Sequence, residues 1–171
     1  MDNYNFYKSI YDREINRRKD LDNSINIPVT ILTLIVGLNS IYVEKSLFTA
    51  FFLNISFVKL FLILIGCFLF LSIFYLIKSY NNLFKGFAYK NLALTKEIRK
   101  FETIDIPKYN EQVDEKEKIS FETELINRLI SVTDNHTIFN DKRSLDLYKA
   151  KTFVIISLIL TGIQLVIVTF K

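Results

Sequence analysis

The sequence predicts an all-α membrane protein with three transmembrane helices and helical cytoplasmic extensions. Half of the 171 residues are hydrophobic, and they are concentrated in three blocks, at residues 25–43, 57–77 and 152–170. Each block is close to the roughly 20 apolar residues that cross a bilayer as a helix. Between the blocks, apolar residues recur every three or four positions, without the alternation typical of strands. These observations divide the chain into four segments.

The first segment, residues 1–24, is predicted to be a cytoplasmic amphipathic helix. One side carries aromatic and aliphatic residues at helical spacing, namely Tyr4, Tyr7, Tyr11 and Ile15. The polar side is assigned to the charged residues Asp12, Arg13, Glu14, Arg17, Arg18, Lys19 and Asp20. We expect this helix to pack on a neighbouring helix and to meet lipid head groups beside the membrane.

The second segment, residues 25–77, is predicted to be a two-span transmembrane hairpin. Pro28 stands near the start of the first span, where proline suits the first helical turn. The second span contains the single cysteine of the chain, so no internal disulfide is possible. Its only charge before residue 78 is Lys59, near the end from which an ammonium group reaches the interface. The short, largely apolar loop at 44–56 is expected to lie at the membrane surface.

The third segment, residues 78–150, is predicted to be a cytoplasmic helical region. The helix of the second span is expected to continue to about Glu102. A loop is predicted at 104–118, because Pro107 cannot continue a helix and the stretch is charged. Another helix then presents an apolar face at Phe121, Leu125, Leu129 and Val132.

A polar stretch separates that helix from the last span. A helix–helix turn is predicted at Asp134, Asn135 and Asn140, which are typical turn residues. Asp141 or Ser144 is then expected to cap a new helix. That helix leads into the fourth segment, residues 151–171, which is predicted to be the third transmembrane helix.

Lysine and arginine counts predict the orientation. Residues 1–26 carry five of them and residues 78–151 carry fourteen, whereas residues 44–56 carry only Lys45. Because cytoplasmic segments are enriched in these residues, the N-terminus and the third segment are expected inside and the C-terminus outside. The expected location is the cell inner membrane, crossed several times.

Catalytic chemistry is weakly indicated, and no cofactor or metal site is expected. One histidine, one cysteine and scattered carboxylates do not form a recognisable metal-ligand pattern. Helical RNases of the HEPN type pair an arginine with a histidine at slightly closer spacing than the seven residues between Arg128 and His136. A membrane-tethered RNase centred on these two residues is therefore kept as an alternative to a protein that is not an enzyme.

Contacts with other molecules are predicted at two places. Gln164 stands in the third span, where an amide needs a hydrogen-bond partner, and Gly162 beside it suits close helix association. These two residues are expected either at a subunit contact or against the first span. His136, Asn140 and Arg143 are expected to meet a neighbouring subunit or a soluble partner.

The layout resembles that of the SLATT-type membrane modules found beside bacterial antiviral systems. The resemblance covers roughly 100 residues: YDREINRRKDLDNS before the first span, the hairpin from Ile25 to Ile77, and the extension that begins at Lys78. The layout is also similar to that of small membrane accessory proteins of RNA-targeting CRISPR systems, some of which carry a degenerate HEPN-like bundle. The resemblance implies an effector that oligomerises and perturbs the inner membrane when a sensor signals infection.

Three functions are compatible with these patterns. The first is a non-enzymatic antiviral effector or accessory protein, a homo-oligomer in the lipid bilayer that permeabilises it. The second is the membrane-tethered RNase. The third is a scaffold that anchors a soluble partner, such as a defence sensor or nuclease, through the Phe121, Leu125 and Leu129 face. The net charge of +4 does not favour direct binding of nucleic acid.

Overall fold

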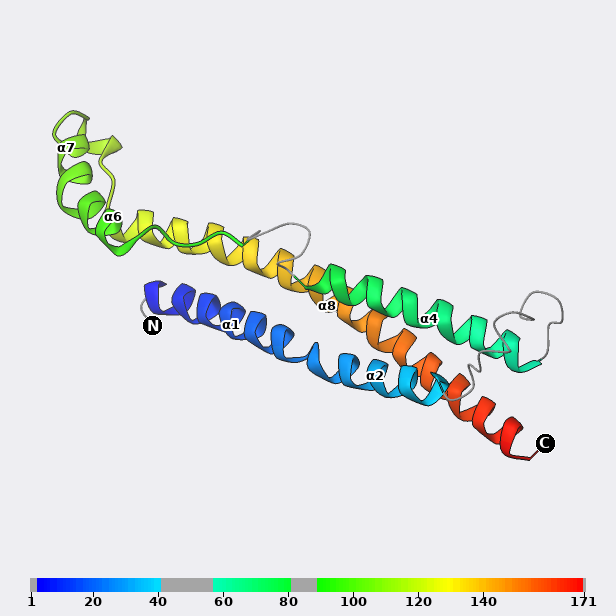
Figure 1. The fold of residues 1–171 in the computed structure, drawn as a ribbon. Coiled ribbons are helices and arrows are strands. Elements are labelled where there is room, and N and C mark those ends of the chain that lie inside the picture. The colour runs from blue at the N-terminus through cyan, green and yellow to red at the C-terminus, as the bar shows by residue number, and fades with distance from the viewer. Residues whose placement is uncertain (1–2, 41–56, 81–88, 171) are drawn as a thin grey trace. The chain divides into compact units, whose positions relative to one another are not determined.

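The computed structural model describes residues 3–40, 57–80 and 89–170, and every regular element in these ranges is a helix (Figure 1). The chain forms two compact units. The first unit combines residues 1–19 with 87–141, and the second combines residues 20–86 with 142–171. The predicted loop at 44–56 lies outside the described residues.

The predicted first helix is confirmed as α1, Asn3–Asn23, and the predicted first span follows as helix α2, Asn26–Ser40. Pro28 lies in the first turn of α2, as predicted, and is buried. The polar side of α1 was assigned incorrectly at Glu14. This residue is only 2% exposed, whereas Phe6 is 47% exposed.

The second unit is a bundle of α2, α4 and the part of α8 that begins at Lys142. Helix α4 spans Phe57–Ser79, and α8 spans Phe121–Thr169. Ser79 and Ser72 of α4 contact the backbone of Arg143 and Ala150, so α4 runs antiparallel to α8. Helix α2 runs parallel to α8, because Asp22 just before it contacts Arg143 and Asn39 near its end contacts Thr161.

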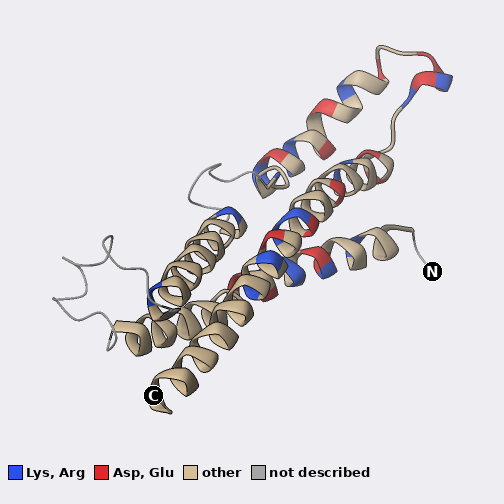
Figure 2. Ribbon diagram, turned by 90° about the vertical axis from the view of Figure 1, so that its right-hand side faces the viewer, with Lys and Arg blue, Asp and Glu red and all other residues tan. Residues whose placement is uncertain are grey.

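The bundle core mixes aliphatic and small side chains. Its buried hydrophobic cluster consists of Leu21, Leu32, Ile35, Ile65, Leu76, Leu147, Ala150 and Val154. The charges of α4 lie near its two ends, and its length between them is uncharged (Figure 2). Among the described residues, three helices are long and apolar enough to cross a membrane, as judged from length and composition.

The prediction that the second span continues as a helix to about Glu102 is wrong. Helix α4 ends at Ser79, and residues 89–94 are not helical. The next helices are α6, Thr95–Lys100, and α7, Ile106–Asn110, joined by the π-helical turn η1, Phe101–Asp105.

Pro107 lies in a helix, whereas the sequence predicted a loop at this place. It occupies the first turn of α7, where no helical bond to its nitrogen is needed. Irregular structure begins only after Asn110 and contains the short 3₁₀ helix η2, Glu115–Glu117.

The predicted turn at Asp134, Asn135 and Asn140 is also wrong. All three residues lie within α8, and neither Asp141 nor Ser144 caps a helix start. Turn propensity was overridden because two of these side chains have partners outside α8. The Asn135 Oδ1 accepts a hydrogen bond of 2.8 Å from the Lys90 backbone N–H, and the partners of Asn140 are described below. The last predicted span is therefore the end of a continuous helix of 49 residues.

Eleven buried positions of α8 follow one spacing, with alternating steps of four and three residues, and Val132 and Asp146 are buried beside this series. The members of the series are Leu129, Thr133, His136, Asn140, Arg143, Leu147, Ala150, Val154, Ser157, Thr161 and Gln164. This spacing is the seam of a coiled coil, which keeps one side of a helix against its neighbours. We call this set the α8 seam.

Candidate functional site

The polar part of the α8 seam is the candidate functional site, and within the first unit it centres on Asn140. This side chain is fully buried. Its Nδ2 donates to the backbone oxygen of Glu14 at 2.9 Å and to the Glu14 Oε2 at 3.0 Å. Its Oδ1 accepts a hydrogen bond of 2.7 Å from the Tyr89 hydroxyl. One amide thus joins three segments of the chain that are distant in sequence.

The buried carboxylate of Glu14 is balanced by arginines. Arg13 and Arg17 lie 3.4 Å and 3.5 Å from its two oxygens. Arg17 also donates to Asp141 at 2.6 Å. The hydrogen bond that Arg17 donates to Asp141 raises the pKa of Arg17, against the opposing effect of burial, so this guanidinium stays charged at any ordinary pH.

His136 is held next to this network. It is 1% exposed, and its ring lies 4.7 Å from the Tyr89 ring and 6.0 Å from the Tyr11 ring, between centroids. Its Nε2 is 2.9 Å from the backbone oxygen of Lys90, a contact that suits a donating Nε2–H. The other nitrogen, Nδ1, has no hydrogen-bond partner in the described part of the chain. The imidazole is packed in the interior and offers no open face to a substrate.

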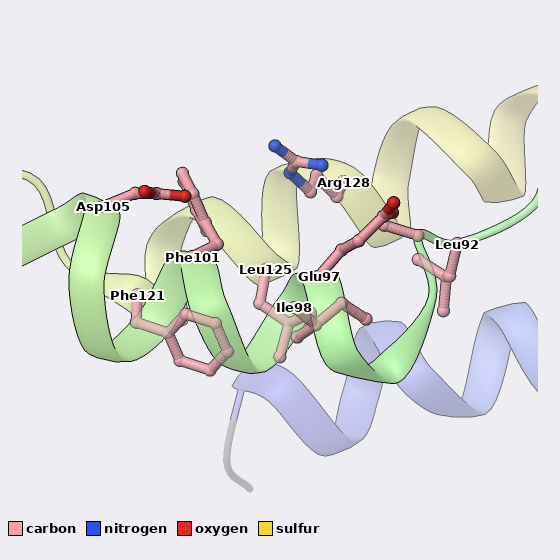
Figure 3. A pocket seen from close by; sticks show the side chains of 9 residues that line it. Leu92, Glu97, Ile98, Phe101, Asp105, Phe121, Leu125 and Arg128 are labelled. Carbon is pink, nitrogen blue, oxygen red and sulfur yellow. The ribbon is translucent and has the colours of Figure 1, made fainter.

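Arg128 has different surroundings. It lines a hollow of about 210 Å³ between α6, η1 and the start of α8, with Leu92, Ile98, Phe101, Phe121 and Leu125 (Figure 3). Its guanidinium lies 4.9 Å from the centroid of the Phe101 ring. His136 lies eight residues further along α8, about 12 Å along the helix axis. The structure therefore does not join Arg128 and His136 in one site.

Arg143 belongs to the second unit and is equally enclosed. Its side chain is 4% exposed, contacts Asp22 at 2.5 Å and donates from Nε to the Ser79 backbone oxygen at 2.7 Å. The Ser79 hydroxyl in turn donates to the Arg143 backbone oxygen. His136, Asn140 and Arg143, which the sequence assigned to contacts with another molecule, are thus buried by their own chain.

Further along the seam the buried polar groups are smaller. Asn39 donates to Thr161 Oγ1 at 3.0 Å and to the Ile35 backbone oxygen at 2.8 Å. Gln164 is 1% exposed, yet neither atom of its amide has a hydrogen-bond partner within the described residues. It lines a small hollow with Val58, Phe61 and Ile167.

The expected joint patch of Gly162 and Gln164 does not form. Gly162 is exposed, and a Cβ added there would meet no atom within 4 Å. Two residues separated by two positions on a helix point about 200° apart, so they face opposite sides. The polar residues that precede Gln164 on the α8 seam are instead Thr161 and Ser157, and both are buried.

In the ranges that the structure describes, no group of three or more His, Cys, Asp or Glu side chains converges in a way that could hold a metal ion. The seam itself was missed in the sequence because its polar members were judged by residue type. Their alternating spacing was the available signal.

Comparison with known proteins identifies no family. No protein-family model matches the chain, and neither the curated proteins nor the solved structures include a significant match.

Proposed function

We propose that this chain is an integral, three-span membrane protein that acts without catalysis, as an oligomerising effector or accessory protein of bacterial antiviral defence that perturbs the inner membrane. The observation that carries the membrane part is the inverted distribution of polarity in the second unit. Leu34, Phe70 and Ile159 are more than half exposed, whereas Ser72, Ser157 and Gln164 are buried. Water favours the opposite arrangement, and hydrocarbon favours this one.

The direction of the three helices supports the proposed orientation. Helices α2 and α8 run parallel and α4 antiparallel, as three successive crossings require. With the lysine and arginine bias of the sequence, this arrangement supports a cytoplasmic N-terminus and an external C-terminus.

Oligomerisation is supported by Gln164. A buried amide without partners costs about 2 kcal/mol or more in an apolar environment. A second copy of the chain that reaches the hollow beside Val58 and Phe61 would supply the missing hydrogen bonds. The antiviral role rests on the resemblance of layout alone.

The test is membrane depolarisation in cells that express the chain together with its trigger. Wild type is expected to depolarise and to cross-link as an oligomer. Gln164→Leu should lose both properties while remaining in the membrane fraction, and Gly162→Ala, which alters an exposed neighbour, should retain them. Unchanged membrane potential alongside intact protection from infection would refute the effector proposal.

A membrane scaffold is the second candidate, and the hollow beside Arg128 favours it. Its lining is mostly apolar and includes Phe121 and Leu125, which the sequence marked as a docking face. Leu129 of the same face is buried and contributes to the core instead. If this hollow anchors a soluble partner, Leu125→Asp should release that partner in a pull-down, whereas Asn127→Asp on the exposed side of α8 should not.

The RNase alternative receives less support, because Arg128 and His136 have separate surroundings. Alanine at both positions is expected to leave the cellular function of the chain intact. Loss of protection with Arg128→Ala and His136→Ala in a correctly inserted protein would restore that alternative.

A further inference from the structure

Two lysines of the second unit converge on one aromatic ring. The Nζ of Lys78 on α4 lies 5.3 Å from the centroid of Tyr75, and the Nζ of Lys149 on α8 lies 5.2 Å from the same centroid. Both distances are within the range of a cation–π interaction. An anion beside this ring would be attracted by both ammonium groups, whose like charges repel each other in its absence.

The nearby carboxylate neutralises only one of these charges. Asp146 lies 3.5 Å from Lys78 and is itself buried. Lys149 has no ion pair in the described part of the chain. The pair of lysines therefore keeps a net positive charge at a surface where Lys78 is 40% exposed.

The ring beneath the lysines is held in place by stacking. Phe153 of α8 stacks on Tyr75 at 5.7 Å, and Phe68 stacks on Phe153 at 6.0 Å. Tyrosine rings with lysines beside them are typical of the membrane–water interface, where one end of the ring is apolar and the other is hydrated. The arrangement joins α4 to α8 and does not depend on a flexible loop.

An apolar strip leads from this site toward the middle of α4. Phe74 lies one turn before Lys78, whose Nζ is 5.6 Å from the centroid of its ring, and Phe70 lies one turn further. Phe74 is 47% exposed and Phe70 is 71% exposed. A ligand with an anionic head and a hydrocarbon tail matches both parts of this surface.

We propose that Lys78, Lys149 and Tyr75 bind the phosphate head group of an anionic phospholipid, whose acyl chain lies along Phe74 and Phe70. This inference rests on the proposed membrane embedding of the second unit. The lipid would then be a specific ligand between α4 and α8, beyond the general attraction of basic residues for an anionic membrane surface.

The test uses the full chain purified in a mild neutral detergent and counts retained phosphatidylglycerol by native mass spectrometry. The double variant Lys78→Gln/Lys149→Gln is compared with Lys142→Gln/Lys151→Gln, which removes the same charge from the same end of the spans. Retention in the first variant is expected to fall about twenty-five-fold, from roughly a fivefold contribution of each lysine. The control variant should retain the lipid as wild type does.

Two further measurements keep the outcome decisive. Lys149→Gln alone, which breaks no ion pair, should lower retention about fivefold. Inorganic phosphate, added without lipid, should not raise the melting temperature as phosphatidylglycerol does. Equal retention by both double variants, or equal stabilisation by phosphate alone, would overturn the lipid site.

Membrane embedding is tested separately by washing cell membranes with alkaline carbonate. Release of wild-type protein would refute the proposed membrane function. Retention in the membrane with equal lipid binding by all variants would refute only the lipid site.

Discussion

The two units bury different kinds of polar group. The first unit encloses a charged residue, Glu14, and supplies an amide and two arginines to it. Between the charged residues near the ends of its helices, the second unit encloses hydroxyl and amide groups such as Ser157 and Thr161 and exposes aliphatic side chains. The first pattern suits a surface in water, where exposed charges remain hydrated, and the second suits a surface in lipid. Both patterns occur on one helix, α8, so they can be compared at matched positions.

The largest difference between the two units is expected when the same charge is placed at one exposed isoleucine of α8 in each unit. Ile138 is 66% exposed and Ile159 is 56% exposed. Ile159→Asp is expected to cost about 3 kcal/mol, because a carboxylate in hydrocarbon is poorly solvated. Ile138→Asp should change stability by less than about 0.5 kcal/mol.

The measurement for this pair is the fraction of protein that stays in carbonate-washed membranes, followed by thermal unfolding in detergent. Loss of membrane association is expected for Ile159→Asp alone. Equal behaviour of the two variants would mean that both exposed surfaces face water.

The next largest effect is expected from Asn140→Leu. This change removes the hydrogen bonds to Glu14 and leaves the Tyr89 hydroxyl without its amide acceptor. The expected loss is about 2–3 kcal/mol, since buried groups are left unsatisfied. Limited proteolysis of the first unit and its melting temperature would report the loss, and Asn127→Leu, at an exposed position of α8, is the control. A stability equal to that of the control would mean that the network contributes little.

A smaller effect is expected from enlarging the seam in the second unit. Ala150 is fully buried beside Ser72, so Ala150→Leu should cost about 2 kcal/mol through overpacking. Gly162→Leu adds a comparable side chain at an open position and is expected to be tolerated. The melting temperatures of the two variants in the same detergent test the assignment, which a reversed order would contradict.

The smallest effect is expected from Asp141→Asn. Its carboxylate pairs with Arg17, but the side chain of Asp141 is 64% exposed. Solvent screening limits such a pair to less than about 0.5 kcal/mol. Thermal unfolding should barely change, and a loss as large as that of Asn140→Leu would mean that this pair is part of the buried network.

The sequence was sufficient to predict the number, order and type of the apolar helices, because hydrophobic blocks of this length have few alternatives. The first helix and the place of Pro28 in the first turn of α2 were also predictable. The continuity of α8 was not, since Asp134, Asn135 and Asn140 have the composition of a turn, and the partners of Asn135 and Asn140 come from distant segments. Turn propensity describes a residue alone, whereas the helical conformation at Asn140 is stabilised by hydrogen bonds to Glu14 and Tyr89.

The same reasoning explains the error at Glu14. The less exposed side of α1 follows Tyr7, Tyr11, Glu14, Arg18 and Leu21, in alternating steps of four and three. A charged residue was assigned to solvent because it is charged, although its position continues the spacing of the aromatic residues. Arg18, at the next step, lies 4.4 Å from the centroid of the Tyr89 ring. The position of Glu14 in this spacing was a better guide to its burial than its hydrophobicity.

The α8 seam also restricts how a gene for this chain can change in length. Within the second unit, Arg143 and Ala150 meet Ser79 and Ser72 of α4, while Arg143 and Thr161 meet Asp22 and Asn39. Inserting one codon between Arg143 and Thr161 would rotate every later side chain by about 100° and put Ser157, Thr161 and Gln164 out of register with both neighbours. An insertion of seven residues would restore the rotation, but it would lengthen one span relative to the other two. Descendants of this sequence can therefore exchange one apolar residue for another on the outer side of α8 in the second unit, but insertions and deletions in this part of the helix should be rare.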